Sequence, residues 1–348
     1  MASVIYLIVI LGLNKWDPMV LAAIGTRFSE LDPAGSEGYD GQFAYYIATN
    51  PSGAAPHLDV PAYRYQRILY PLLCRFLAFG QRDLIPWIMP LVNILALTAG
   101  TYFVERLLKG FGVTSYYAIV YGLFPGLFLS LRLDLNEPLA YALVCGGILA
   151  FERGKERSGA ILFGLAGLAK EQALLFAGGY ALAFIARRKW EELKELALFS
   201  FFPMAVLQGA LWLRFGDFGI GSGGAGATPF SIIPYGGLLQ IGFLNIRALL
   251  LWLIILGPGA LFPSIALSYL SAVRLVKGER HPLAFSTLLH ALILAFLPFS
   301  TWREFLAILR FLSGLAAATI LYGALIRSRR MLNYSLFWLS YLVFIFKV

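Results

Sequence analysis

The residues best suited to chemistry lie in one polar interval near the start of an otherwise apolar sequence. This interval covers about residues 30–80 and contains a mixed set of ionisable side chains: Asp32, Glu37, Asp40, His57, Asp59, Arg64 and Arg67. Charges are costly in lipid, so a membrane chain keeps them mainly where they are used. We therefore treat the interval as the candidate working site, and the remaining elements as the scaffold that positions it.

Asp40 is the leading candidate for catalysis, within the motif Tyr39-Asp40-Gly41-Gln42. A carboxylate here could accept a proton from an acceptor hydroxyl or help to hold a divalent metal ion. The structural alternative is a helix N-cap, because an aromatic helical pattern follows over 41–48 and Asp is a favoured capping residue. The two roles are compatible. His57 and Asp59 are further candidate metal ligands, although lone residues in a proline-rich loop usually bind no metal.

A second acidic pair, Asp134 and Glu137, precedes Pro138 between two apolar runs. The spacing is that of a capping box, with Asp134 as the N-cap and Glu137 three residues later. The functional alternative is a second acidic group on the outer side that supports acceptor or metal binding. Both interpretations stay open at this point.

Lys170 and Glu171 interrupt the apolar run 159–186. Basic residues flank this run at both ends, which favours two half-length helices folded back at residues 170–172, with both flanks on the cytoplasmic side. Each arm is too short to cross a core of about 30 Å, so we expect the turn to lie within protein or a wet cavity. The two charges form either a structural ion pair with each other or part of a binding site.

Arginine side chains provide candidates for phosphate binding. Arg64, Arg67, Arg303 and Arg310 all fall on the side predicted to be outside, and the planar guanidinium matches phosphate geometry. Arg310 lies within an apolar run, where it could instead extend to the membrane interface.

The segment 62–79 has the pattern of an amphipathic helix along the membrane surface. Apolar residues recur at helical spacing, while Arg64, Arg67 and Arg75 share another face that we expect to point toward lipid head groups. Pro71 either bends this helix or begins its second half.

The composition indicates a polytopic membrane protein. The chain has 348 residues, of which 59% are hydrophobic and 14% charged, against about 25% charged in soluble domains. We predict an all-α bundle forming a single domain over 1–348, with about 10–11 spans, some of them short or re-entrant. The net charge of +9 fits basic cytoplasmic loops, and no basic run with interleaved aromatics indicates nucleic-acid binding. The two cysteines, Cys74 and Cys145, form neither a disulfide framework nor a metal motif.

The remaining polar features receive structural interpretations. The glycine-rich stretch within loop 216–227 matches a dinucleotide fingerprint in spacing, but no strand pattern precedes it, so we predict a flexible outer loop. His281 is interpreted as a loop residue beside Pro282, and His290 as a packed or hydrogen-bonded side chain.

These motifs resemble the GT-C superfamily of integral-membrane glycosyltransferases. Members have one span and then a large outer loop that opens with an acidic motif and holds two surface helices. Here residues 39–42 resemble the acidic motif, and residues 67–80 resemble the second surface helix. Leu133-Asp134 is similar to a second acidic position, and Leu168-Ala169-Lys170-Glu171 resembles the turn of a short helical pair. The resemblance covers about the first 190 residues.

The resemblance implies transfer of a sugar from a polyprenyl-phosphate donor to a glycan, lipid or protein acceptor on the outer face, with inversion at the anomeric carbon. Asp40 would be the general base, supported by Tyr39, Gln42, Asp134 and Glu137. The donor phosphate would be bound by Arg64, Arg67, Arg303, Arg310, Lys170 and Glu171. Mg²⁺ or Mn²⁺ would be the metal, held by Asp40, His57 and Asp59.

Two other classes stay open on the sequence. A transporter or flippase of lipid-linked or anionic solutes would suit the interrupted helix at Lys170, since discontinuous helices build transporter sites. A non-catalytic membrane subunit would tolerate replacement of the outer carboxylates. The location expected for so compact a chain is a bacterial inner membrane, with the active site facing outside and lipids as neighbours.

Overall fold

The computed structural model describes residues 2–345, and regular secondary structure over these residues is entirely helical, as predicted. The N-terminal part contains α1 (Ala2–Leu13), α2 (Met19–Ala22), α3 (Thr26–Ser29), α4 (Gly41–Thr49), α5 (Pro61–Tyr65) and α6 (Leu69–Leu77). The middle contains α7 (Ile85–Gly110), α8 (Ala118–Gly122), α9 (Pro125–Arg132), α10 (Glu137–Glu152), α11 (Glu156–Ala169), α12 (Leu174–Ala186), α13 (Trp190–Leu196) and α14 (Phe202–Phe215). The C-terminal part contains α15 (Gly236–Leu244), α16 (Ile246–Leu256), α17 (Phe262–Val276), α18 (Pro282–Ala295), α19 (Phe299–Arg303), α20 (Phe305–Leu325), α21 (Arg329–Ser335) and α22 (Leu342–Ile345).

Four of the described helices are long and apolar enough to cross a membrane. They cover Arg82–Gly110, Trp190–Phe215, Ile246–Val276 and Phe305–Leu325. Three shorter apolar helices accompany them: Ala2–Leu13, Glu171–Ala186 and Pro282–Ala295. These helices agree with a membrane protein, while the predicted count of 10–11 spans and their sidedness stay predictions.

Helix α20 is the central element of the bundle. In its most apolar stretch, 78% of the residues are buried inside the protein. The helix packs against α9, α18, α10 and α7. Its contact with α9 is close, because a Cβ at Gly126 would lie 2.0 Å from the carbonyl oxygen of Leu309. Small residues allow such approach between apolar helices. Arg310, the next residue of α20, is therefore fixed in position by the core packing.

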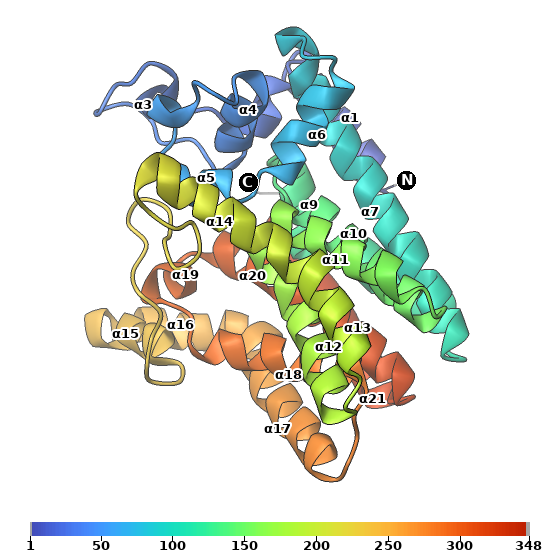
Figure 1. The fold of residues 1–348 in the computed structure, drawn as a ribbon. Coiled ribbons are helices and arrows are strands. Elements are labelled where there is room, and N and C mark those ends of the chain that lie inside the picture. Colours follow the sequence, from blue (N-terminus) through green and yellow to red (C-terminus); the bar gives the residue numbers. More distant parts are fainter. Residues whose placement is uncertain (1, 346–348) are drawn as a thin grey trace.

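The N-terminal part of the chain forms a cap of short helices at one end of the bundle, where α3, α4, α5 and α6 lie together in Figure 1. The predicted helix over 41–48 is confirmed as α4. The helix predicted over 62–79 is divided into α5 and α6 by Gln66–Ile68, and Pro71 lies in the first turn of α6. Apolar Leu72 and Phe76 are exposed on α6, as expected at a lipid surface.

The predicted basic face toward lipid head groups is wrong. Arg64 and Arg67 are each only 8% exposed, because their guanidinium groups turn inward to carboxylates. Arg75 donates to the carbonyl oxygens of Ala48 and Thr49 at the end of α4. The three arginines therefore turn to partners on different elements, because the helix is interrupted between α5 and α6 and buried acceptors determine where each side chain points.

The predicted break at Lys170 is confirmed. Helix α11 ends at Ala169, Lys170 is extended, and a 3-10 turn over Glu171–Ala173 leads into α12. The two helices pack mainly against different partners, α11 against α10 and α12 against α18. The break therefore places a polar turn among packed helices, where its backbone can be satisfied by protein groups.

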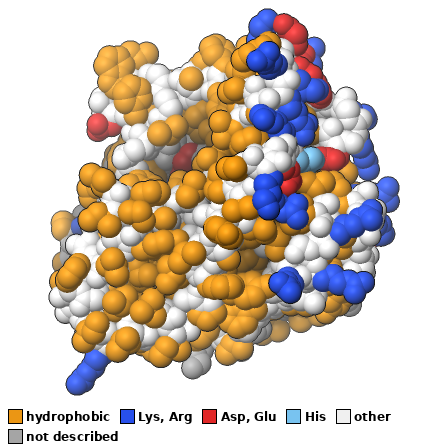
Figure 2. Space-filling view, turned by 90° about the horizontal axis from the view of Figure 1, so that it is seen from below, with side chains coloured by type: hydrophobic (Ala, Val, Ile, Leu, Met, Phe, Trp, Pro, Cys, Tyr) orange, Lys and Arg blue, Asp and Glu red, His pale blue; other side chains and the backbone are white. Residues whose placement is uncertain are grey.

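The surface has the character expected of a membrane protein. Figure 2 shows hydrophobic side chains over much of one face, with most of its Lys and Arg side chains gathered along one edge. Cys74 and Cys145 are both free and buried.

Candidate functional site

The candidate site is built around Asp40 at the start of α4. Asp40 occupies the N-cap position, but its side chain makes no capping hydrogen bond. A Cβ at Gly41 would lie 2.1 Å from the carbonyl oxygen of Leu133, so glycine at 41 allows α4 to lie directly on the turn between α9 and α10. The carboxylate is thereby turned toward α5 and α20, where two arginines meet it.

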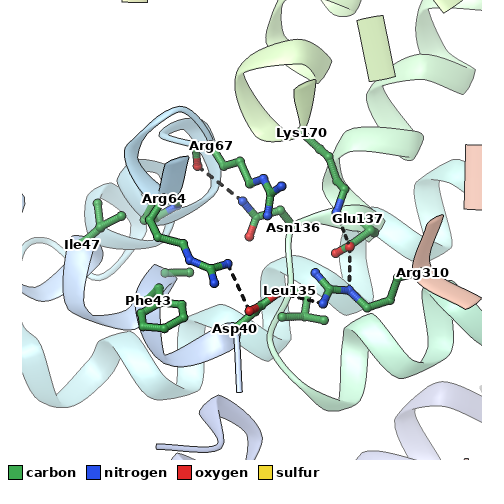
Figure 3. Close-up of a pocket in the computed structure, with 12 residues that line it drawn as sticks. Asp40, Phe43, Ile47, Arg64, Arg67, Leu135, Asn136, Glu137, Lys170 and Arg310 are labelled. Carbon is green, nitrogen blue, oxygen red and sulfur yellow. Dashed lines mark hydrogen bonds and ion pairs between the residues drawn. The ribbon is translucent and has the colours of Figure 1, made fainter. Parts of the chain in front are cut away.

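Two guanidinium groups approach Asp40 from different elements, as Figure 3 shows. Arg64 Nη1 lies 3.1 Å from Asp40 Oδ1, and Arg310 Nη1 lies 2.8 Å from Oδ2. Each arginine is held from behind by a second carboxylate. Arg64 donates through Nε and Nη2 to Asp59 at 2.6 and 2.7 Å, and Arg310 donates through Nε to Glu137 at 2.9 Å. Asp59 and Glu137 thus orient the two guanidinium groups so that the Nη1 atom of each points to Asp40.

This arrangement keeps Asp40 ionised. Burial opposes the charged form, but the fields of Arg64 and Arg310 outweigh it and hold the pKa of the Asp40 carboxyl well below its usual range. The side chain is nevertheless 30% exposed, so the carboxylate can be reached from the surface. A charged, reachable carboxylate between two oriented cations is the feature that a proton acceptor or an anion site would require.

Glu137 and Lys170 form the deepest part of the cluster. Glu137 is fully buried, and its Oε1 accepts from Lys170 Nζ at 2.5 Å and from Arg310 Nε. Its other oxygen, Oε2, is buried and has no hydrogen-bond partner among the described residues. Glu137 therefore retains a free acceptor position.

The predicted capping box at the start of α10 is wrong. The N-cap is Asn136, and Asp134 adopts a left-handed conformation with φ of 49° and is fully buried. Both oxygens of Asp134 lack hydrogen-bond partners among the described residues, and burial raises the pKa of its carboxyl well above the ordinary value. Asp134 does not line the cavity at Asp40. The turn needs a residue that tolerates positive φ, and Asp is one of the few that do.

Of the two alternatives for Lys170 and Glu171, an ion pair with each other is not formed, and each side chain pairs with another element. Lys170 donates to Glu137, while Arg67 donates through Nε and Nη2 to the carboxylate of Glu171 at 2.8 and 2.7 Å. These contacts join the α11–α12 break to the start of α10 and to the segment after α5. The charges predicted in separate loops are therefore brought into one network.

A small cavity of about 20 Å³ lies at the centre of this network. Its charged lining comprises Asp40, Arg64, Arg67, Glu137, Lys170 and Arg310. A cavity of this size holds about one water molecule. A larger ligand therefore requires side chains to move, and the exchange of one ion pair for another is the simplest such movement.

Three predicted site residues, Tyr39, Gln42 and Arg303, do not line this cavity. Tyr39 donates to Glu304 at 2.9 Å and accepts from Arg310 at 3.3 Å. Gln42 is buried. Its side chain accepts from the amide of Gly25 and donates to the carbonyl oxygen of Glu37, so it attaches the preceding loop to α4. Arg303 is exposed on α19 and lies over the ring of Phe299.

The predicted metal ligands are not gathered in one place. Asp59 is engaged by Arg64, and His57 Nδ1 lies 2.6 Å from the carbonyl oxygen of Phe28 beside a separate cavity of about 160 Å³. Within residues 2–345 no group of three His, Cys, Asp or Glu side chains is placed to hold a metal ion. The predicted set of Asp40, His57 and Asp59 therefore does not form a metal site in this conformation.

Two residues of the network were not predicted. Asn136 lines the cavity and donates to the carbonyl oxygen of Ala169 at 3.0 Å, which ties the α10 start to the α11–α12 break. Tyr63 accepts from Arg67 at 2.6 Å and places its ring against both Arg64 and Arg67. The only signal for Tyr63 was its place in the sequence, next to Arg64 and four residues before Arg67.

Comparison with protein-family models, with curated proteins and with solved structures finds no match for this chain.

Proposed function

We propose that this protein is a membrane glycosyltransferase that takes a sugar from a polyprenyl-phosphate donor and transfers it to an acceptor on the outer face of the membrane. The observation that carries the proposal is the placement of Asp40 between Arg64 Nη1 and Arg310 Nη1, both oriented by other carboxylates. The same cluster lies where the short helices α4 to α6 meet the apolar bundle. A donor with a long apolar tail and an anionic head group needs these two surroundings at one place.

The arginines would bind the phosphate of the donor. Arginine forms charge-assisted, bidentate hydrogen bonds with phosphate as well as with carboxylate, so a phosphate can compete with Asp40 for the two Nη1 edges. Asp59 and Glu137 would keep the guanidinium planes in place during this exchange. Lys170 and Arg67 line the same cavity and would add positive field around the leaving phosphate.

Asp40 would then act as the general base. With its arginines turned to phosphate, the carboxylate loses part of the field that depresses its pKa, and its basicity rises when the donor is bound. It would accept the proton of an acceptor hydroxyl, whose oxygen attacks the anomeric carbon while the bond from that carbon to the phosphate oxygen breaks. The displaced polyprenyl phosphate leaves with both bonding electrons, and the sugar inverts. The buried free oxygen of Glu137 could accept from a sugar hydroxyl.

The proposal is tested by donor turnover with purified full-length protein. A panel of polyprenyl-phosphate sugars is supplied with candidate acceptors, with and without Mg²⁺ or Mn²⁺, and release of polyprenyl phosphate is measured. We expect Asp40→Asn to abolish release, while the matched change Asp32→Asn, at an exposed site in the same loop, leaves it intact. Full activity of Asp40→Asn would end the proposal, and binding without turnover by any donor would favour a carrier.

A further inference from the structure

The glycine-rich loop between α14 and α15 is attached to three separate parts of the protein. At its start, Gln208 Oε1 accepts from the amides of Gly219 and Ile220 at 2.7 and 3.1 Å. At its centre, the amide of Ala225 donates to Asp59 Oδ2 at 2.9 Å. Farther on, Thr228 and Ser300 exchange hydrogen bonds between the amide of each and the hydroxyl of the other. The loop is therefore fastened across the region between α5 and α19.

Asp59 is the point where this loop meets the candidate site. Its side chain is only 6% exposed and accepts from four donors: the amide of Val60, the amide of Ala225, and Nε and Nη2 of Arg64. The third nitrogen of the same guanidinium, Nη1, faces Asp40. A continuous chain of charge-assisted contacts thus runs from the loop amide through Asp59 and Arg64 to Asp40.

The glycine content of the loop has a local reason. A Cβ at Gly224 would lie 2.8 Å from Arg64 Nη2 and 3.0 Å from Asp59 Oδ2, and a Cβ at Gly219 would lie 2.7 Å from the carbonyl oxygen of Ala62. Only glycine allows the backbone to approach the Arg64–Asp59 pair so closely. The loop covers this pair, and close packing explains Gly219 and Gly224 without a nucleotide.

We propose that Asp59 is a positioning residue that couples closure of loop 219–228 to the orientation of Arg64. When the loop is closed, the Ala225 amide and Arg64 share one carboxylate, and the guanidinium is held with Nη1 toward Asp40. When the loop is open, Asp59 loses a donor and Arg64 loses its cover, so the guanidinium can rotate away. The coupling belongs to the ligand-free fold, and its meaning for catalysis rests on the function proposed above.

Hydrogen exchange over residues 219–228 of the full-length protein tests the coupling directly. We expect Asp59→Asn and Ala225→Pro to accelerate exchange at the neighbouring amides by about tenfold or more, since each removes a hydrogen bond to a buried charge. Arg64→Lys keeps the charge but loses the two-pronged contact with Asp59, and we expect it to accelerate exchange as well. Asp217→Asn, at an exposed position just before this segment, is the matched control and should exchange as wild type does.

The Arg64 variant decides between coupling and a local anchor. An exchange rate over residues 219–228 in Arg64→Lys equal to that of wild type would overturn the proposal, because closure of the loop would then not depend on Arg64. Slow exchange within 305–325 in every variant provides the check that the buried helix α20 stays folded.

A second measurement reports the other end of the coupling. Linkage requires that the ratio of the anion affinities of the closed and open loop equals the factor by which anion binding shifts the closure equilibrium, so a variant that favours the open loop should bind the anion more weakly. We expect Ala225→Pro, which leaves every charged side chain in place, to weaken binding of farnesyl phosphate by about tenfold in titration calorimetry. Equal affinity in the variant and wild type would contradict the coupling. If wild type binds no farnesyl phosphate, the proposed function fails, and the exchange experiment still decides the coupling.

Discussion

The carboxylate of Asp40 lies between two guanidinium groups whose other edges are occupied by Asp59 and Glu137. The pairing of each arginine with two carboxylates has an energetic reason. A buried arginine without a partner is costly, and one carboxylate cannot satisfy two guanidinium groups fully. The second carboxylates stabilise the arginines in the absence of a ligand, so that Asp40 can exchange partners without leaving a charge buried and unpaired.

The lowered pKa of Asp40 gives a prediction on pH. Aspartate in an unfolded chain has a pKa of about 3.9, and the pKa of Asp40 in the folded protein is lower. The ion pairs of Asp40 therefore contribute their full stability above the unfolded pKa. This contribution is lost only as the pH falls through the folded pKa. We expect the difference in melting temperature between wild type and Asp40→Asn to stay constant from about pH 8 to about pH 5. We expect the difference to shrink as the pH falls below about 4, and a difference that stays constant there would show that Asp40 is not held by the arginines.

Removal of charge from Glu137 should be far more damaging than removal of charge from a surface pair. Glu137→Gln leaves Lys170 and Arg310 facing each other without a buried anion between them, and breaking such a pair typically costs about 3–5 kcal/mol. The control is Glu37→Gln, whose partner Arg27 is exposed and whose ion pair is worth about 0–1 kcal/mol. Chemical unfolding in detergent measures both, and similar losses for the two variants would contradict the assignment of Glu137 as a buried counter-ion.

At the scale of elements, the site depends on how closely α4 lies on the turn after α9. Gly41→Ala places a methyl group 2.1 Å from the Leu133 carbonyl oxygen, so the helix must shift and Asp40 must move with it. We expect a loss of stability of about 1–3 kcal/mol, as for other overpacked sites. Gly110→Ala is the control, because nothing lies within 4 Å of its Cβ and alanine favours the helical end of α7. Equal stability of the two variants would show that the contact at Gly41 is not needed.

The elements were predictable where the signal is local. Helix α4 and the break at Lys170 follow from periodicity and from charges that interrupt an apolar run, and both are confirmed. The pairing of charges was not predictable, because Arg310 and Asp40 are 270 residues apart and Glu171 and Arg67 are 104 apart. Asp134 shows the same limit, since its spacing fits a capping box but a left-handed turn, set by packing, buries it.

At the scale of the whole molecule, the cluster must face one side of the membrane if the proposed donor is to reach it. Basic residues in successive connections predict that residues 153–157 and 187–194 lie in the cytoplasm, and the outer loop containing Asp40 on the opposite side. The native cysteines are both buried, so single cysteines introduced at exposed sites can be labelled against a low background.

We therefore expect Ser52→Cys, in the outer loop, to react with a membrane-impermeant maleimide in intact cells. Lys155→Cys, exposed in the connection between α10 and α11, should react only after the membrane is opened with detergent, because the reagent cannot otherwise reach the cytoplasmic side. Labelling of position 155 in intact cells would reverse the orientation and place the Asp40 cluster inside. In that case donors carried on the outer leaflet could not be used, and the substrate would have to be presented from the cytoplasm.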